Sequence, residues 1–337
     1  MVSMKDIAQE CGVSVATVSK ALNDYSDIGA ETRKRVHEAA ERMGYFPNSS
    51  ARALKTKRTY NLGVLFVDEA NSGLTHDFFS HVLEAFKRTA EKEGYDITFT
   101  SSNIAGRKTS YLEHCRYRGV DGVVIACIDF YDPAVQELIR SDLPVVTIDH
   151  VFDNKISIVS DNVKGEEDLV KYVISQGHRK IAYIHGADSS VTRGRLNSFF
   201  RTTTEAGIDI PEEYILESPY RVVVGAQECT TRLLNLPDPP TCILYPDDLT
   251  VLGGLNVIRS RGLSVPDDIS IAGYDGLPLS YEMYPPFTTI WQDTNSIGNM
   301  AAEKLISLIE NPKTTLIERV VVPGKLVEGG TVADIRC

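Results

Sequence analysis

Apolar residues recur at helical spacing over the first 45 residues of the chain and predict a small helical head. The pattern predicts helices at about residues 4–11, 15–23 and 30–43. Gly12 permits a left-handed turn between the first two helices, and Ser14 is in position to cap the second. Two helices joined by a tight glycine turn are typical of a helix-turn-helix, although a small helical bundle without a DNA-binding role has the same periodicity.

After residue 60 the pattern changes to short apolar runs that alternate with amphipathic segments. The apolar runs predict strands at about residues 61–67, 95–100, 120–128, 144–149, 180–185, 242–245, 269–273 and 325–331. The amphipathic segments predict helices that include residues 77–94, 249–262 and 294–310. This alternation predicts parallel sheets covered on both faces, and its repetition predicts an α/β body of two doubly wound subdomains with a cleft between them.

Charge is distributed unevenly between these two parts of the chain. The 337 residues carry 35 Lys and Arg against 46 Asp and Glu, and taken whole the net charge of -11 argues against a nucleic-acid partner. The first 58 residues, however, hold ten basic and seven acidic side chains (+3), which leaves 25 basic and 39 acidic ones (−14) in the remainder. A basic head on an acidic body indicates that the head binds DNA.

The composition and motifs exclude several other classes of protein. The six cysteines are scattered, with no CxxC pair and no close Cys/His quartet, which argues against a disulfide framework and against a zinc site. The chain lacks a signal-peptide pattern and any apolar run near the roughly 18 residues of a membrane span, so we expect a cytoplasmic protein without membrane contact. The phosphate-loop, dinucleotide and nucleophile-elbow motifs are absent, so we expect no catalytic residue, cofactor or enzyme activity.

The second predicted helix of the head has a small, polar outer face that suits the major groove of DNA. Val15 and Ala16 near its start allow close approach and contact with thymine methyl groups. Lys20 is placed to donate to guanine acceptors. Phosphate contacts, which position the helix without reading sequence, suit the polar side chains Thr17, Ser19 and Asn23.

The head closely resembles that of the lactose/galactose-repressor (LacI/GalR) family. The resemblance rests on residues 4–8 (MKDIA), 12–23 (GVSVATVSKALN), 31–33 (ETR) and 44–48 (GYFPN). Gly29 departs from the family, which usually has a serine cap for the third helix, but glycine is nearly as good a cap. The resemblance implies a sequence-specific transcriptional regulator with a helix-turn-helix domain at residues 1–46.

Residues 47–59 form a basic linker that, in the family, becomes a hinge helix only on operator DNA. Paired hinge helices of a dimer enter the minor groove there, and a leucine wedges open the central base step. Leu54 occupies that position, and an isolated apolar residue among bases suits such a wedge. We expect further DNA contacts from Asn48, Ser49 and Arg52. The alternative interpretation is a flexible basic tether.

Polar residues stand at the carboxyl ends of several predicted strands of the body, where doubly wound sheets bind ligands. They include Asp149, Asp247 and Asp275, each of which alone is also typical of a helix cap or a loop. The resemblance to the family extends over this periplasmic-binding-protein-like body, though more loosely. It implies an effector site that contains Phe78, Asp149, Arg195, Tyr220, Asp247, Asp275 and Gln292. Carboxylates, a guanidinium and an aromatic face together suit a neutral polyol such as a sugar.

The leading hypothesis is therefore a repressor of carbohydrate-utilisation genes that leaves its operator when a small molecule, a sugar, closes the cleft. We expect a homodimer on a pseudo-palindromic operator, since the two symmetries match. The body is expected to span residues 60–337, with one subdomain at about 60–159 and 290–319 and the other at about 160–289 and 320–332. Two alternatives stay open. One is a co-repressor-dependent regulator that binds a nucleobase or another small metabolite. The other, in a different class, is a transport binding protein, although that would need a signal peptide instead of the head.

Overall fold

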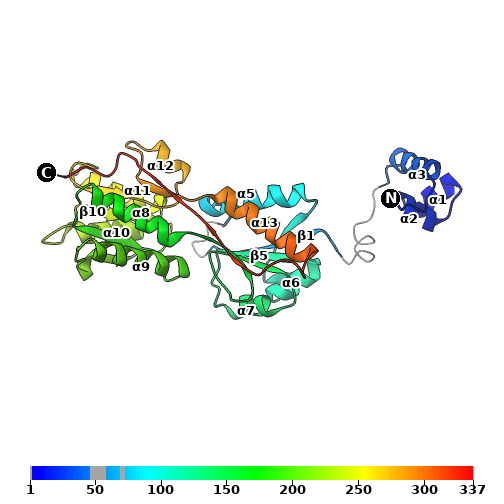
Figure 1. Ribbon diagram of the computed structural model, residues 1–337, viewed down its shortest axis with the longest axis horizontal. Coiled ribbons are helices and arrows are strands. Elements are labelled where there is room, and N and C mark those ends of the chain that lie inside the picture. Colours follow the sequence, from blue (N-terminus) through cyan, green and yellow to red (C-terminus); the bar gives the residue numbers. More distant parts are fainter. Residues whose placement is uncertain (1, 46–57, 69–72, 337) are drawn as a thin grey trace. The chain divides into compact units, whose positions relative to one another are not determined.

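The computed structural model describes residues 2–45, 58–68 and 73–336 (Figure 1). The chain separates into two compact units, one that ends at Thr59 and one that begins at Tyr60. The linker residues predicted to contact DNA lie outside the described residues: Asn48, Ser49, Arg52 and Leu54. Among the helices that are described, none is both long and apolar enough to cross a membrane.

The first unit is a three-helix head. Its helices are α1 (Met4–Cys11), α2 (Val15–Leu22) and α3 (Ala30–Arg42). Ile7, Val18 and Val36, one from each helix, are completely buried and form the centre of its core. Gly12 ends α1 in the left-handed conformation, with a φ of 63°, and the Ser14 hydroxyl caps α2 by accepting the Thr17 N–H. Turn and cap therefore have the geometry expected from the sequence.

The body begins with a lobe built on a six-stranded parallel sheet, which we call the first lobe. The strand order is β13-β7-β6-β5-β1-β2. The strands are β1 (Asn61–Phe66), β2 (Asp96–Phe99), β5 (Gly122–Ala126), β6 (Val145–Ile148), β7 (Ile156–Ser160) and β13 (Arg319–Val322). The helices are α5 (Asp77–Lys92), α6 (Tyr111–Arg118), α7 (Pro133–Arg140) and α13 (Thr294–Glu310), with a short helix η1 (Gly73–Thr75) and a hairpin of β3 (Asn103–Ile104) and β4 (Arg107–Lys108).

The second lobe repeats this plan on a four-stranded parallel sheet in the order β11-β10-β8-β9. The strands are β8 (Ile181–His185), β9 (Ile215–Glu217), β10 (Cys242–Leu244) and β11 (Ser270–Ala272). The helices are α8 (Asn162–Ser175), α9 (Ser190–Glu205), α10 (Val223–Leu234), α11 (Asp248–Ser260) and α12 (Pro278–Glu282), with a short helix η2 (Glu212–Tyr214). An antiparallel pair, β12 (Thr289–Trp291) and β14 (Lys325–Val327), completes the body.

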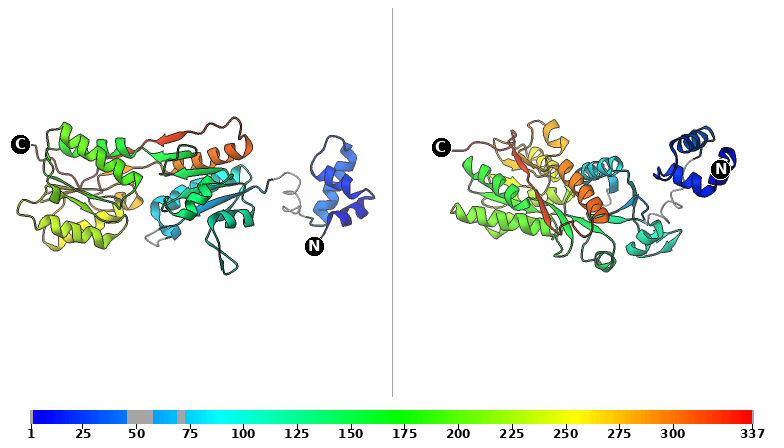
Figure 2. Two further views of the ribbon diagram at one scale, coloured as in Figure 1. Left: turned by 90° about the horizontal axis from the view of Figure 1, so that it is seen from below. Right: turned by 45° about the vertical axis from the view of Figure 1, so that its right-hand side comes forward.

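Helices cover both faces of each sheet, as Figures 1 and 2 show. In the first lobe α5 and α13 share one apolar core with the sheet, while α6 and α7 share the core on the opposite face. In the second lobe α8 and α9 pack on one face, and α10 and α11 pack on the other. The predicted α/β class, with two doubly wound parallel sheets, is therefore confirmed.

Some strands differ from the sequence prediction. The pattern predicts no strand at β7, β9 or β13, although all three belong to the sheets. β7 is buried along its whole length with Ser157 and Ser160 inside, so it shows neither an apolar run nor a polar alternation. β13 pairs with β7 in the first lobe, so residues 320–322 belong to that lobe and not to the second subdomain as predicted.

Candidate functional site

A cavity of about 770 Å³ lies at the carboxyl ends of strands from both lobes. Ligands of doubly wound sheets bind in this kind of position, because loops and helix N-termini converge there. All seven residues that the sequence predicts for the effector site line this one cavity: Phe78, Asp149, Arg195, Tyr220, Asp247, Asp275 and Gln292. They come from both lobes, so a ligand that touches all of them would bridge the two halves of the body.

Arg195, on α9, is a buried cation in the cavity wall, with only 3% of its surface exposed. Its Nε donates to the Asn162 side chain at 2.8 Å, and its Nη1 donates to the Pro246 carbonyl at 2.9 Å. The guanidinium carbon lies 3.4 Å from the centre of the Tyr274 ring, on which the group stacks. These contacts fix the plane of the guanidinium and leave Nη2 without a hydrogen-bond partner among the described residues, so it is available to a ligand.

Asp275 and Gln292 form a pair on the same wall. The Gln292 amide donates to the Asp275 carboxylate at 2.7 Å, which orients the carboxylate. Burial raises the pKa of Asp275 to about 7, while the Arg195 guanidinium acts in the opposite direction. The Asp275 backbone has a φ of 104°, unusual for a residue other than glycine, and such conformations persist at sites where the surroundings enforce them.

Asp149 lies at the end of β6 and also has a left-handed backbone, with a φ of 60°. Its carboxylate accepts the Ser160 N–H at 3.1 Å. Burial raises the pKa of Asp149, and that hydrogen bond partly offsets the effect. Asp149 therefore contributes a carboxylate from the first lobe to the cavity that Arg195 and Asp275 of the second lobe also line.

Asp247 holds the loop that carries Tyr220 and Arg221. One of its carboxylate oxygens accepts the Thr250 N–H and caps α11, and the other accepts the Arg221 N–H, each at 2.8 Å. The second bond stabilises the left-handed backbone of Arg221, whose φ is 64°. Burial raises the pKa of Asp247, and these two hydrogen bonds lower it. The main effect of Asp247 is thus to position its neighbours.

Tyr220 lies against the backbone of Gly186, just after β8. A Cβ at position 186 would come within 2.0 Å of the Tyr220 ring, so only glycine leaves room for it. The Tyr220 hydroxyl is 2.9 Å from the Thr192 hydroxyl on α9. Ring and hydroxyl are therefore both held, and the ring is a rigid flat surface in the cavity wall.

Three polar contacts join the two lobes beside the cavity. Arg221 Nη1 lies 3.2 Å from an Asp77 carboxylate oxygen at the start of α5. The Ser190 hydroxyl donates to the Asp149 carbonyl at 2.8 Å, and Arg193 reaches the Tyr131 hydroxyl at 3.4 Å. Each bond would have to break if the lobes moved apart.

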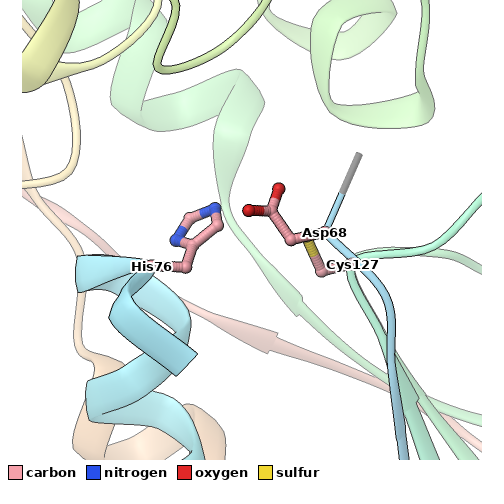
Figure 3. A group of neighbouring side chains, drawn as sticks. All are labelled: Asp68, His76 and Cys127. Carbon is pink, nitrogen blue, oxygen red and sulfur yellow. The ribbon is translucent and has the colours of Figure 1, made fainter. Parts of the chain in front are cut away.

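The first lobe contributes further wall residues. His150, which with Asp149 ends an apolar run of the sequence, stacks on Phe130, with ring centres 4.4 Å apart and an interplanar angle of 11°. Asp68, His76 and Cys127, which the sequence did not predict, also line the cavity, and their side chains lie close together (Figure 3). Burial, with a further contribution from the Arg221 charge, lowers the pKa of His76 to about 4. No sequence motif links these residues, because they follow or precede different elements and meet only through the sheet order.

In the head, α2 presents the residues predicted to face DNA. Val15, Ala16, Lys20 and Asn23 are exposed, and Thr17 and Ser19 are half-buried. Lys20 Nζ forms an ion pair with Asp27 at 2.5 Å, and the Asn23 amide donates to the Ser19 carbonyl. The outer face of α2 is thus small and polar with one cation, as a helix that enters the major groove requires.

Two family models match this chain. The model for bacterial regulatory proteins of the lacI family matches residues 3–48, and that for a periplasmic binding protein-like domain matches residues 170–332. Among curated relatives, the chain is 31% identical to a probable HTH-type transcriptional repressor, ExuR, of Bacillus subtilis (strain 168), with 93% of each chain covered. It is also 31% identical to the HTH-type transcriptional repressor PurR of Pasteurella multocida (strain Pm70), with 96% and 95% covered.

Solved structures show the same relationship. The lac repressor dimer bound to operator and the anti-inducer ONPF superposes with a TM-score of 0.82 at 28% identity, over 98% of this chain and 99% of that one. A complex of the transcriptional regulator CelR with cellobiose has a TM-score of 0.71 at 24% identity, over 98% and 100%, and so shares the fold. The relatives are transcriptional repressors and not enzymes. With its helix-turn-helix head, its two-lobed body and these relatives, the chain belongs to the lacI family of bacterial regulatory proteins.

Proposed function

We propose that this regulator represses carbohydrate-utilisation genes in the cytoplasm and leaves its operator when a sugar binds in the cavity. The observation that carries the proposal is the composition of the cavity wall. Buried or half-buried carboxylates, a fixed guanidinium and a rigid aromatic ring line one space between the lobes. These are the groups that recognise a polyhydroxylated ring.

Each wall group has a role toward such a ligand. The carboxylates of Asp149 and Asp275 accept hydrogen bonds from hydroxyl groups, and Arg195 Nη2 donates to a hydroxyl or ring oxygen. Tyr220 packs against the apolar C–H face of the sugar. A cavity of about 770 Å³ lies within the size range of small-molecule sites and accommodates a mono- or disaccharide.

The position of the site between the lobes provides a way for ligand binding to change operator affinity. A ligand that touches both lobes favours the arrangement in which they are close, and so shifts a two-state equilibrium of the body. We infer that the linker at residues 47–59 converts this shift into loss of operator affinity, with Leu54, Asn48, Ser49 and Arg52 as its DNA contacts. A homodimer on a pseudo-palindromic operator fits this scheme, because each head then reads one half-site.

A second candidate is a regulator that binds DNA only with a nucleobase in the cavity. The similarity to repressors named PurR supports this candidate. The stacked rings of Phe130 and His150 also support it, since flat rings suit a base. The two candidates predict opposite effects of the ligand on operator affinity. A sugar inducer weakens operator binding, and a nucleobase co-repressor strengthens it.

A thermal-shift screen of the full chain against sugars and nucleobases distinguishes them, because a ligand of the folded state raises the unfolding temperature. Fluorescence anisotropy with an operator selected from randomised duplexes then shows whether the ligand weakens or strengthens operator binding. We expect a sugar to stabilise the protein and to release the operator. Asp275→Asn should abolish the sugar-dependent shift, whereas Asp209→Asn, at an exposed position that does not line the cavity, should retain it. Stabilisation by nucleobases alone, with tighter operator binding, would overturn the proposal.

A further inference from the structure

Asp68, His76 and Cys127 converge on the first-lobe wall of the cavity because of the order of the strands. Asp68 follows β1, Cys127 follows β5, and His76 immediately precedes α5. β1 and β5 are neighbouring parallel strands in which Phe66 is the register partner of Ala126. This register places Asp68 and Cys127 at the same sheet edge, and the connection from β1 to α5 returns His76 to it. One potential donor atom of each residue lies within 4.8 Å of those of the other two (Figure 3).

We propose that Asp68, His76 and Cys127 bind a divalent metal ion of the zinc class on this wall of the cavity. A carboxylate oxygen, an imidazole nitrogen and a thiolate sulfur form a donor set that suits this ion and does not suit Mg²⁺ or Ca²⁺, which prefer oxygen alone. Three protein ligands leave a fourth tetrahedral position open, and all three ligands line the cavity.

The geometry needs only small adjustments. With zinc bonds of about 2.0–2.3 Å, neighbouring donors in a tetrahedral site lie about 3.3–3.8 Å apart. The donor separations of at most 4.8 Å therefore exceed those of a formed site by at most about 1.5 Å. Asp68 and Cys127 lie in the loops that follow β1 and β5, and a change in the χ1 angle of a short side chain spans such a distance.

The hydrogen bonding of His76 determines which nitrogen is the ligand. Its Nδ1 accepts the Phe79 N–H at 3.4 Å as the cap of α5. Figure 3 shows the ring nitrogen farther from the backbone, Nε2, turned toward the Asp68 carboxylate. Nε2 carries the ring proton while Nδ1 accepts, so coordination through Nε2 moves that proton to Nδ1. The cost is the long hydrogen bond that caps α5, and the ring must also turn so that the Nδ1–H and the Phe79 N–H do not face each other.

Charges near the three ligands both favour and oppose a cation. The Asp68 carboxylate and the Cys127 thiolate neutralise a divalent ion, and Asp77 adds a negative charge at the start of α5. The guanidinium of Arg221 opposes it, since Arg221 acts on His76 and pairs with Asp77. An ion at this position would offer its fourth site to an oxygen atom of the cavity ligand and would extend the polar wall of the first lobe.

The experiment is a titration of the chelator-treated full chain with Co²⁺, a spectroscopic substitute for Zn²⁺, in the presence of a thiol-free reductant. We expect one equivalent to bind with a thiolate-to-cobalt charge-transfer band, and Zn²⁺ to displace it. Cys127→Ser should abolish the band. His76→Asn, which preserves a good helix cap, should weaken Co²⁺ binding at least about tenfold.

Matched controls keep the outcome specific to the site. Cys229→Ser on α10 and His81→Asn on α5 change residues of the same types that do not line the cavity, and both should bind Co²⁺ like the parent. Asp68→Asn provides a further variant if His76→Asn fails to fold. Absence of a thiolate band in the parent, persistence of the band in Cys127→Ser, or unchanged affinity in both His76→Asn and Asp68→Asn would overturn the proposal. Operator binding and the sugar response of the metal-free chain are measured separately, so failure here does not affect the proposed function.

Discussion

Arg221 of the second lobe and Asp77 of the first lobe form an ion pair beside the cavity, with 3.2 Å between Nη1 and the carboxylate oxygen. The arginine side chain is only 10% exposed and the aspartate is 51% exposed, so the pair is partly shielded from solvent. The Arg221 backbone is itself held by the buried Asp247 carboxylate. One chain of contacts therefore runs from the cap of α11 to the start of α5 and joins the lobes.

If this pair stabilises the arrangement in which the lobes are close, its loss should weaken ligand binding. We expect Asp77→Asn to raise the Kd of the sugar found by thermal shift about two- to fivefold, the range that one partly exposed pair supports. The variant should also lose part of the dependence of Kd on salt. Isothermal titration at low and high salt measures both effects. Glu84→Gln removes a charge from the exposed Glu84–Arg88 pair within α5 and should leave Kd unchanged. An unaltered Kd in Asp77→Asn would show that the pair has no role in closure.

Much of the site could be anticipated from the positions of polar residues after apolar runs. The apolar run of β6 is followed directly by Asp149, and Asp275 comes three residues after the end of β11. Parallel sheets bring such strand ends to one edge. Asp149 and Asp275 follow from that rule. Arg195 and Tyr220, by contrast, lie in a helix and a loop, and only the family resemblance singled them out.

Other features depended on tertiary contacts that a single sequence does not encode locally. Ser157 inside β7 resembles a loop residue, but its hydroxyl is satisfied by Thr147 on the neighbouring strand at 2.9 Å. Asp68, His76 and Cys127 meet because β1 lies next to β5, an order that nothing near any of the three residues indicates. The role of Asp247 as the anchor of Arg221 likewise required the loop conformation.

Lys20 should contribute directly to operator specificity. In the free head it pairs with Asp27, and both side chains are about half-exposed, so the lysine is free to exchange its partner for a guanine. Lys20→Ala should weaken specific binding by about 1–3 kcal/mol and relax the preference at one base position. Anisotropy with the selected operator and single-base variants of it measures this. Asp27→Asn releases Lys20 and removes a charge that repels phosphates, so it should strengthen operator binding. Retention of the full base preference in Lys20→Ala would remove the residue from sequence readout.

Arg195 should be needed for the effector response but not for operator binding. Arg195→Ala removes the donor to the ligand and leaves the buried Asn162 side chain and the Pro246 carbonyl without their partner. We therefore expect loss of sugar-induced release together with a fall of about 3 kcal/mol in unfolding free energy. Urea unfolding and operator anisotropy separate the two effects. Arg195→Lys keeps the charge but lacks the planar set of N–H donors of a guanidinium. It should recover part of the lost stability and little of the sugar response. A normal sugar response in Arg195→Ala would exclude it from the site.

Glu166, on α8, should make stability depend on pH. It is 1% exposed, one of its oxygens has no hydrogen-bond partner within the described part of the chain, and the other lies 3.4 Å from the Tyr183 hydroxyl. Burial raises the pKa of Glu166 from 4.5 to about 7, so the folded state favours the protonated acid. Its contribution to stability is therefore fully present below about pH 4.5 and is lost as the pH rises through 7.

Glu166→Gln should remove this dependence. At pH 8 the parent keeps a buried carboxylate that the variant lacks, and a pKa shift of this size corresponds to about 3 kcal/mol. We expect Glu166→Gln to unfold at a higher temperature than the parent at pH 8, and the difference to shrink or reverse at pH 5, where Glu166 is already protonated. Calorimetry at both pH values measures this, and comparison with the parent at each pH cancels the titration of Asp275, which both proteins share. The same difference at pH 5 and pH 8 would mean that Glu166 does not change its charge in this interval.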